Sequence, residues 1–457
     1  MAAQPFPYPK SSTPGSRPGE GEGRYMNCAP VVEGDRTYVR RVPGLTVAAT
    51  AAASGIRGMI DVNGTLFIVW NGSVTAVNGS TVTTLSGSIE GSDGVTLARN
   101  NRVTDGVSTP QIVAVRESGG AYVISSGGVT PYPDGDLPAP NSVAFLGGFL
   151  IFSIADGRIF ASELNSTDIE PLSFATAESR ADGLRRVIVQ GSLVYAMGSS
   201  TIEPYQNAGT MPFPLQRAAT VIPVGLLTTM AVAGDEEAWN RALYFVASDN
   251  TVRALSGYET AIVSTADVER FVAASMVSTL ELTVFNWAGT PYLAISSNIG
   301  TWVLNVASGA WHERVSAGQQ RWRAKRSVFS GERWLFGDTQ SGKLFTLSSA
   351  LTEDGAPMGG YIQSGQLKAF PARIATKLSA DFTEANMTIY VSWSHDGGKT
   401  WATELQRSIT DAERWPLAVA NLGLSTHHGI ITKFRWAGSA DFSFSGATAD
   451  RLDVRQT

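Results

Sequence analysis

Residues 186–209 read RVIVQGSLVYAMGSSTIEPYQNAG, and this stretch sets the pattern for most of the chain. It holds three short runs of β-branched and aromatic residues, which are separated by Gly-Ser and Gly-Ser-Ser. Such runs are typical of strands, and Gly and Ser at the breaks are typical of tight turns. The stretch therefore predicts three antiparallel strands that are joined by two turns.

The same pattern recurs from residue 56 to residue 347, at spacings of about 40 to 50 residues. Its seven units lie at residues 58–85, 94–133, 142–164, 186–209, 242–257, 282–314 and 327–349. Repeated units of a few strands favour closure into a ring, because a ring leaves few exposed sheet edges. We predict an all-β fold with a six- or seven-bladed β-propeller, and a β-sandwich stack is the alternative.

The spacing of the strands changes after residue 350. Residues 358–457 are rich in strands but lack the spacing of blades, which predicts a separate antiparallel β-sandwich module of about 100 residues. Residues 264–275 (STADVERFVAAS) predict a short helix between blades. The predicted domains are 1–45, an extended N-terminal arm and first strand; 46–350, the β-propeller; and 351–457, the sandwich with an Asp-box hairpin.

The first 24 residues contain five prolines, which deny this segment a helix. One interpretation is a terminus that is disordered by itself. The alternative is an arm that becomes ordered against a neighbouring subunit, with Phe6 and Tyr8 as apolar anchors. Under either interpretation, we expect removal of the arm to leave the fold of the single chain intact.

Composition narrows the class of protein. Charged residues make up 16% of the chain, the formal net charge is −5, and Cys28 is the only cysteine. The charge balance does not call for a nucleic-acid or membrane partner. A single cysteine rules out an intrachain disulfide. We expect no membrane span and no secretory signal, and therefore synthesis in a host cytoplasm.

One motif is highly specific. Residues 394–401 (SHDGGKTW) match the Asp-box pattern S-x-D-x-G-x-T-W. In this pattern the carboxylate accepts hydrogen bonds from backbone N–H groups of a turn and thereby closes a β-hairpin. This box resembles the Asp boxes of sialidases, which lie away from the active site. We therefore interpret it as structural. Its residues are Ser394, Asp396, Gly398, Thr400 and Trp401.

The chain gives little support for catalysis or metal binding. The four histidines are His312, His395, His427 and His428. His427 and His428 are adjacent, and on a strand they would point to opposite faces, so they would not chelate together. The sequence also lacks a complete nucleophile elbow, P-loop or dinucleotide-binding fingerprint. We predict no metal, no cofactor and no enzymatic activity.

One run is densely basic and includes an aromatic residue. Three interpretations remain open: a solvated blade edge, a protein interface or a contact with a nucleic-acid backbone. The residues of this possible interface are Arg321, Trp322, Arg323, Lys325 and Arg326.

Three stretches resemble the tail nozzle (hub), or packaged-DNA-stabilisation, proteins of short-tailed phages. Residues 38–46 (YVRRVPGLT) resemble the R-x-x-P-G segment of that family, and residues 198–203 (GSSTIE) are similar to its blade motif. Residues 433–453 resemble its closing strands. One departure is residues 418–429 (AVANLGLSTHHG), which replace an Arg-rich step, so a charge contact at that step is not carried over.

The resemblance implies a structural protein of the virion tail. A homohexameric ring would lie below the portal and its adaptor protein, with tailspikes or tail fibres outside and a needle or plug protein at the tip. Genomic double-stranded DNA would pass through without sequence-specific binding. The alternative from another class is a glycan-binding or sialidase-like propeller, which would need an arginine cluster and a Tyr–Glu pair.

Overall fold

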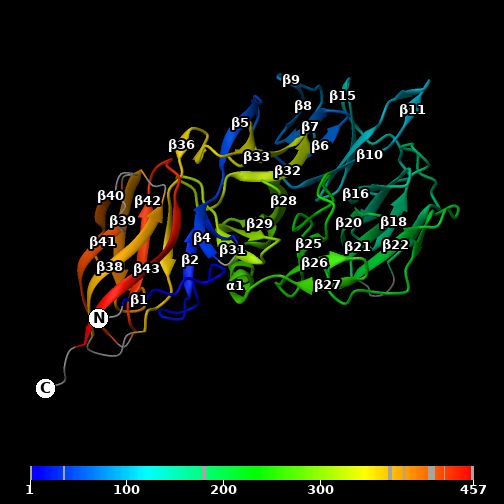
Figure 1. Ribbon diagram of the computed structural model, residues 1–457. Helices are drawn as coiled ribbons and strands as arrows, with labels where there is room; N and C mark the ends of the chain where they lie inside the picture. Colours follow the sequence, from blue (N-terminus) through cyan, green and yellow to red (C-terminus); the bar gives the residue numbers. More distant parts are fainter. Residues whose placement is uncertain are drawn as a thin grey trace.

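The computed structural model describes residues 3–33, 36–177, 182–368, 373–383, 386–409, 417–426 and 428–453. Within these residues the regular secondary structure is almost entirely β-strand, with one α-helix and one short 3-10 helix. Figure 1 shows a propeller beside a smaller sandwich, which contains the orange and red strands. The first and last strands, β1 (Gln4–Pro5) and β43 (Ser443–Asp453), both lie in the sandwich.

The stretch at residues 186–209 forms strands of one blade, as the sequence predicts. β20 (Leu184–Gln190) pairs with β21 (Leu193–Gly198), and β21 pairs with β22 (Ile202–Asn207), both antiparallel. Gly191 takes φ +58° in the first turn, a conformation that glycine adopts without steric cost. Most of β21 is buried, because the sheet is covered on both faces by neighbouring blades.

Seven sets of four antiparallel strands form the blades within the described residues, five as separate four-stranded sheets and two as parts of larger sheets. This confirms the predicted propeller and matches the upper of the two predicted blade numbers. From the innermost strand outward, the blades are β6 (Gly58–Val62), β7 (Thr65–Trp70), β8 (Ser73–Asn78) and β9 (Thr81–Thr84); β10 (Val95–Arg99), β13 (Ile112–Arg116), β14 (Ala121–Ser125) and β15 (Gly128–Pro131); β16 (Pro140–Leu146), β17 (Phe149–Ile154), β18 (Arg158–Ala161) and β19 (Phe174–Thr176); β20, β21, β22 and β23 (Leu215–Arg217); β24 (Val232–Ala233), β25 (Leu243–Val246), β26 (Val252–Ser256) and β27 (Glu259–Ile262); β28 (Glu281–Trp287), β29 (Thr290–Ser297), β30 (Gly300–Asn305) and β31 (Ala310–Glu313); and β32 (Ala324–Ser330), β33 (Arg333–Asp338), β34 (Lys343–Ser348) and β5 (Gly44–Thr50).

The ring closes through a strand from near the start of the chain. β5 pairs antiparallel with β34, so the outer strand of the seventh blade comes from residues 44–50. The inner strand β32 packs against β6 of the first blade. Short strands extend this pattern: β35 (Thr352–Glu353) and β36 (Ala356–Pro357) at the seventh blade, and the hairpin β11 (Val103–Thr104) and β12 (Val107–Ser108) at the second.

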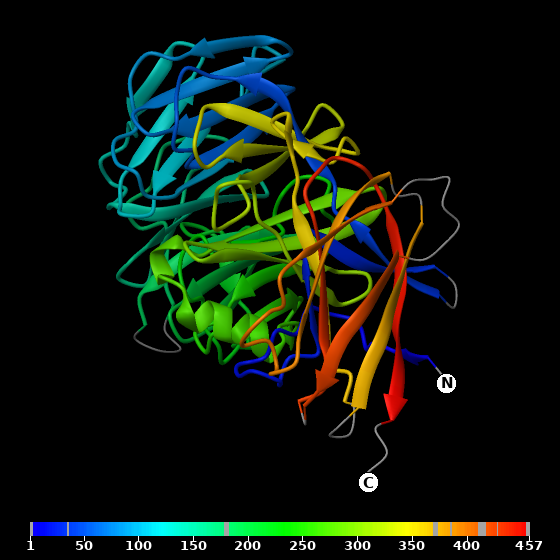
Figure 2. The same ribbon diagram turned by 90° about the vertical axis from the view of Figure 1, so that its left-hand side faces the viewer.

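The sandwich combines strands from both ends of the chain. One sheet contains β3 (Cys28–Glu33), β4 (Arg36–Arg41), β43 (Ser443–Asp453), β38 (Arg373–Thr383) and β41 (Leu417–Ser425), and β1 (Gln4–Pro5) pairs with β43. The other contains β2 (Gly23–Met26), β37 (Gly360–Ser364), β42 (Ile431–Trp436), β39 (Met387–Ser394) and β40 (Leu405–Ile409). Figure 2 shows these sheets in front of the propeller.

The second sheet of the sandwich is continuous with the sixth blade. β2 pairs with β37 on one side, and Met26 pairs with Glu313 of β31 on the other, so one nine-stranded sheet runs through both parts. The sequence analysis did not anticipate this continuity or the use of N-terminal strands in the sandwich. The division of the chain after residues 45 and 350 remains a prediction.

The N-terminal arm packs on its own chain. Phe6 is 4% exposed in the sandwich core, and the ring of Tyr8 lies 5.0 Å from that of Phe444. Ser12 donates its backbone N–H to the Trp311 carbonyl at 2.7 Å. The interpretation of residues 1–24 as a disordered terminus is therefore wrong for the described part of the arm, because Phe6 and Tyr8 pack within the same chain. The interpretation as an arm that meets a neighbouring subunit stays a prediction.

The predicted helix is α1 (Ala266–Ala274), and the 3-10 helix spans Val277–Thr279. Val268, Phe271 and Val272 of α1 join the core of the fifth and sixth blades, which explains the helical spacing of the apolar residues in this segment. Neither of these helices is long and apolar enough to cross a membrane.

Candidate functional site

The basic run at residues 321–326 lies at the start of the seventh blade, and its cations face carboxylates of the same chain. Glu281, which is 4% exposed, accepts a hydrogen bond from Arg321 at 2.5 Å. Arg326 lies 3.5 Å and Lys325 3.9 Å from its second carboxylate oxygen. One buried carboxylate therefore serves three cations.

These three cations change the acidity of Glu281. Burial alone would raise the pKa of this carboxyl, but the Coulomb attraction of Arg321, Lys325 and Arg326 lowers it to about 2. Glu281 therefore stays ionised over the physiological range. The ion cluster joins β28 of the sixth blade to β32 of the seventh.

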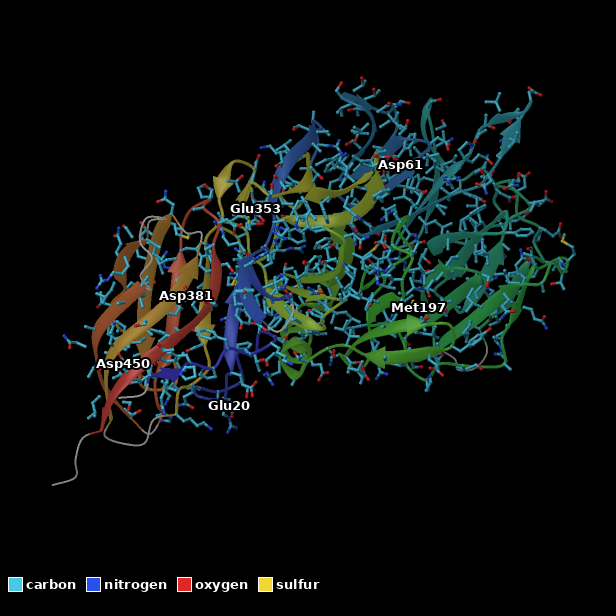
Figure 3. All side chains as sticks on the ribbon, in the orientation of Figure 1. Glu20, Asp61, Met197, Glu353, Asp381 and Asp450 are labelled. Atoms are coloured by element: carbon cyan, nitrogen blue, oxygen red, sulfur yellow. The ribbon has the colours of Figure 1, made fainter. Side chains whose placement is uncertain are left out.

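Trp322 and Arg323 of the run are also engaged within the chain. Arg323 makes a bidentate contact with the buried Asp338, at 3.1 and 2.7 Å. Trp322 is fully buried, and its indole N–H donates to Glu353 at 3.0 Å. Figure 3 marks Glu353 in the region between the sandwich and the propeller. The side chains of these arginines are largely buried, so the interpretation of the run as a solvated blade edge does not fit them. The interpretation of the run as a protein interface remains a prediction.

A cavity of about 270 Å³ lies on the propeller axis, lined by inner strands of several blades. Its wall carries Arg186 and Arg326 together with the acidic loop Asp235, Glu236 and Glu237. Arg186 lies 3.6 Å from Asp235. Burial and the neighbouring Asp235 raise the pKa of Glu236 to about 8. The cavity is thus a mixed-charge, partly desolvated space without a surplus of cations for DNA.

The blade motif at residues 198–203 forms a turn that is held by an acid the sequence analysis missed. Asp182 accepts hydrogen bonds from the backbone N–H groups of Ser200 and Thr201, at 2.7 and 2.9 Å. A side chain on Gly198 would come within 2.6 Å of the Asp182 carboxylate. The only signal for Asp182 is an acid between two blades, which is too common to identify it.

The segment at residues 38–46 carries the chain from the sandwich into the propeller. Arg41, at the end of β4, donates to the Met358 carbonyl at 2.5 Å. Gly44 begins β5, where a Cβ atom would lie 2.2 Å from the Thr352 carbonyl oxygen. Only glycine fits this close approach of two backbones. The close approach of the two backbones thus explains why the R-x-x-P-G pattern has glycine at this position.

The Asp box closes the turn after β39 at one end of the sandwich. Asp396 accepts the backbone N–H of Thr400 at 2.9 Å and its hydroxyl at 2.6 Å. The Ser394 hydroxyl donates to Asp396 and accepts the Gly398 N–H at 2.9 Å. Hydrogen bonds from Thr400, and then from Ser394, hold the pKa of Asp396 well below its usual range. The Trp401 ring lies 4.2 Å from the Lys433 ammonium.

The described histidines do not converge. Burial, and then the charge of Arg314, lowers the pKa of His312 to about 3. The ring of His395 contacts the Leu422 carbonyl at 2.7 Å, and the backbone N–H of His428 donates to Thr426 at 3.1 Å. His427 lies outside the described residues. Among the residues that the structure covers, no group of three His, Cys, Asp or Glu could hold a metal ion.

A family model described as "Bacteriophage P22 Gp10, beta-propeller" matches residues 26–352. No curated protein matches the chain. Among solved structures, BamB from Moraxella catarrhalis is 14% identical, with a TM-score of 0.41 over 66% of this chain and 97% of that one. BBS1N in complex with ARL6DN is 13% identical, with a TM-score of 0.42 over 67% and 96%. The computationally designed Ika8 protein is 11% identical, with a TM-score of 0.40 over 76% and 99%.

Proposed function

Because the chain belongs to the phage structural family described as Bacteriophage P22 Gp10, beta-propeller, we propose that it forms the nozzle, or hub, of a short-tailed phage. In this role a homohexameric ring lies below the portal and its adaptor, helps to retain packaged DNA and provides the conduit for its ejection. The family match over residues 26–352 is the observation that carries the proposal. The proteins of this family are components of the virion tail, so this chain acts in the virion.

The construction of the molecule supports a rigid load-bearing part. Blades share buried cores, and a nine-stranded sheet ties the propeller to the sandwich. Glu281 and its three cations fasten two blades together. A conduit wall that faces the pressure of packaged DNA needs stiffness of this kind, because loosely joined parts would separate under load.

The charge of the chain supports passage of DNA without tight binding. Each copy carries a formal net charge of −5, so a ring of copies is acidic. Lysine and arginine contacts with phosphates would add affinity that rapid exit has to overcome. The densest basic run pairs with carboxylates of its own chain. Retention of the genome then falls to a needle or plug at the tip, and tailspikes or fibres attach outside.

The first experiment is assembly. We expect the purified protein, mixed with its portal and adaptor proteins, to form hexameric rings that electron microscopy can count. A matched sample without portal and adaptor controls for self-association. A persistent monomer in both samples, and its absence from purified virions, would remove the nozzle assignment.

The second experiment separates the nozzle from an enzyme. Heads that are assembled without this protein should fill with DNA and then lose it, which nuclease sensitivity of the genome measures. Full retention of DNA in such heads would place the protein elsewhere in the particle. Cleavage of fluorogenic glycosides by the isolated protein would instead favour the sialidase-like alternative.

A further inference from the structure

The loop that joins β18 to β19, residues 163–172, is an acidic and apolar surface of the third blade. Its sequence, ELNSTDIEPL, contains three acids and no basic residue. All three acids are exposed, and none forms an ion pair among the described residues. Leu164 and Leu172 of the same loop are 63% and 67% exposed. The exposed acids are Glu163, Asp168 and Glu170.

Buried residues hold this loop in one conformation. Ile169 is buried in the core that the second and third blades share, and its backbone N–H donates to Asp134 at 2.7 Å. Asn165 donates its backbone N–H to the Gly148 carbonyl at 2.7 Å. The acids and leucines around these anchors are therefore presented in a fixed arrangement, and a partner that binds them loses little conformational entropy.

The hairpin of β11 and β12 enlarges this surface. Its base is joined to the loop, because the Asn101 N–H donates to the side-chain oxygen of Asn165 at 3.1 Å. Residues 101–109 are all exposed, and among them Val103 and Val107 are 61% and 63% exposed. Aliphatic side chains that gather at one end of a molecule, rather than lying scattered, mark an interaction site. We call the loop and the hairpin together the blade-three surface.

The outer face of one sandwich sheet carries aromatic and basic side chains. Tyr361 of β37, Arg435 of β42 and Tyr390 of β39 lie in one row, because Arg435 pairs with both tyrosines in the strand register. Lys433, two positions before Arg435, lies on the same face, with its ammonium 4.2 Å from the centre of the Trp401 ring. We call this the sandwich face. Figure 1 shows its strands at one end of the molecule and β11 and β18 at the other.

The sandwich face has positive charge that the described residues do not neutralise. Phe434 is fully buried between Lys433 and Arg435, so the core lies behind the sheet. Arg435 is already paired with Glu404 at 2.5 Å. The ammonium groups of Lys433 and of Lys399, which is exposed in the Asp-box turn, have no carboxylate partner among the described residues. Tyrosine, tryptophan and arginine beside such charges are typical of protein interfaces.

Two different surfaces at opposite ends of one molecule are what a head-to-tail contact between copies requires, and such contacts can close into rings. We propose that the blade-three surface of one copy binds the sandwich face of the next copy. This rests on the ring of copies proposed above and names the surfaces that join neighbours in it. The acids of the loop meet Lys399 and Lys433, and the exposed leucines and valines lie against the aromatic rings.

Charge reversal in separate and mixed samples tests the contact. Glu163→Lys/Glu170→Lys places lysines against lysines, and Lys399→Glu/Lys433→Glu places acids against acids. We expect each double variant alone to lose the rings that the wild type forms with its portal and adaptor, as counted by electron microscopy. An equal mixture of the two variants should form rings again, because their altered charges attract and the two kinds of copy can alternate around a ring of six.

A matched variant controls for charge reversal itself. Glu259→Lys/Glu332→Lys reverses two exposed acids on the fifth and seventh blades and should assemble as the wild type does. Rings from either charge-reversed variant alone, or no rings from their mixture, would overturn the contact, and rings of the wild type would leave the nozzle assignment standing. A wild-type protein that forms no rings would overturn both proposals.

The apolar part of the contact has its own test. Leu164→Ser/Leu172→Ser should weaken association of the copies about tenfold, because the contact loses buried apolar area. The unfolding temperature of the single chain should stay unchanged, since both leucines are exposed there. Leu424→Ser, at a leucine 54% exposed on β41 of the other sandwich sheet, is the control. Equal assembly of the two, or variants that form rings but fail to bind portal and adaptor, would contradict a contact between copies.

Discussion

Asp396 fixes the Asp-box turn through hydrogen bonds from Thr400 and Ser394. Asp396→Ala leaves the turn N–H groups without their acceptor, so we expect a lower unfolding temperature for the sandwich. Because the pKa of Asp396 is lowered in the folded protein, its stabilisation is present above the unfolded-state pKa and disappears as the pH falls through the folded value. Thermal unfolding at pH 7, with Asp136→Ala as an exposed control, measures the effect. Equal melting of the two variants would argue against a structural box.

Glu281→Gln should be among the most damaging single changes, because it leaves three cations without their shared carboxylate. We expect a loss of about 3 kcal/mol or more in the free energy of unfolding at pH 7. The folded-state pKa of about 2 is below the ordinary value, so the loss is full above pH 4.5 and shrinks as the pH approaches 2. Denaturant titration at pH 7 and pH 3 measures this. Glu259→Gln, on an exposed strand, is the control, and a penalty independent of pH would contradict the ionic explanation.

The residues of the Asp box lie close together in the sequence, whereas those of the Glu281 cluster do not. This difference decides which of the two sites can be recognised from the sequence. The Asp-box pattern is visible because Ser394, Asp396 and Thr400 lie within one turn. Glu281 and Arg321 are 40 positions apart, and Asp182 holds its turn from a different strand connection. A run of basic residues is easy to find, but the carboxylates that neutralise it are fixed only by the stacking of blades. The role of the run at an interface is still untested.

At the scale of elements, the N-terminal arm is a structural part of the sandwich. Phe6→Ala should cost about 3 kcal/mol of unfolding free energy, as truncation of a buried aromatic side chain does. Val32→Ala, on an edge strand with the side chain 62% exposed, is the control and should change stability by less than about 0.5 kcal/mol. Denaturant titration compares the two variants. A neutral Phe6→Ala would restore the expectation that the arm is dispensable.

Elements with local partners were predictable, and those with distant partners were not. Strands of one blade follow one another in sequence, so turns such as Gly191-Ser192 and the spacing of α1 locate them. β1 pairs with β43 and β5 pairs with β34, across most of the chain. Proline-rich composition indicates an extended arm, but it contains no information about which surface the arm meets.

At the scale of the whole molecule, the nine-stranded sheet should make the two parts unfold together. We expect a single transition by calorimetry, with tryptophan fluorescence and circular dichroism coincident. Arg24→Gln removes a side-chain contact across the β2–β31 junction and should begin to separate the two parts. Arg158→Gln serves as the control, with one transition retained. Two well-separated transitions in the wild-type protein would show that the sheet does not couple them.

The repeat in the sequence predicted the overall architecture, but it left the number of blades open between six and seven. The seventh unit at residues 327–349 offers three strands, and its fourth is β5 from residues 44–50. A count of repeats therefore leaves six or seven open, because ring closure borrows a strand from outside the repeated region. The same borrowing hides the edge of the sandwich, whose strands β1 to β4 precede the propeller.

Closure by β5 and by β1 also sets the order of events during synthesis. β5 leaves the ribosome before any blade exists, yet its partner β34 is made about 300 residues later, after six blades. β1 waits still longer, for β43. The propeller can therefore close only after its seventh blade has emerged, and the sandwich cannot complete itself on the ribosome, although domains generally fold as they emerge. The nascent chain carries unpaired edges until translation is nearly over, and this interval, rather than the finished virion, is where chaperones would act on it.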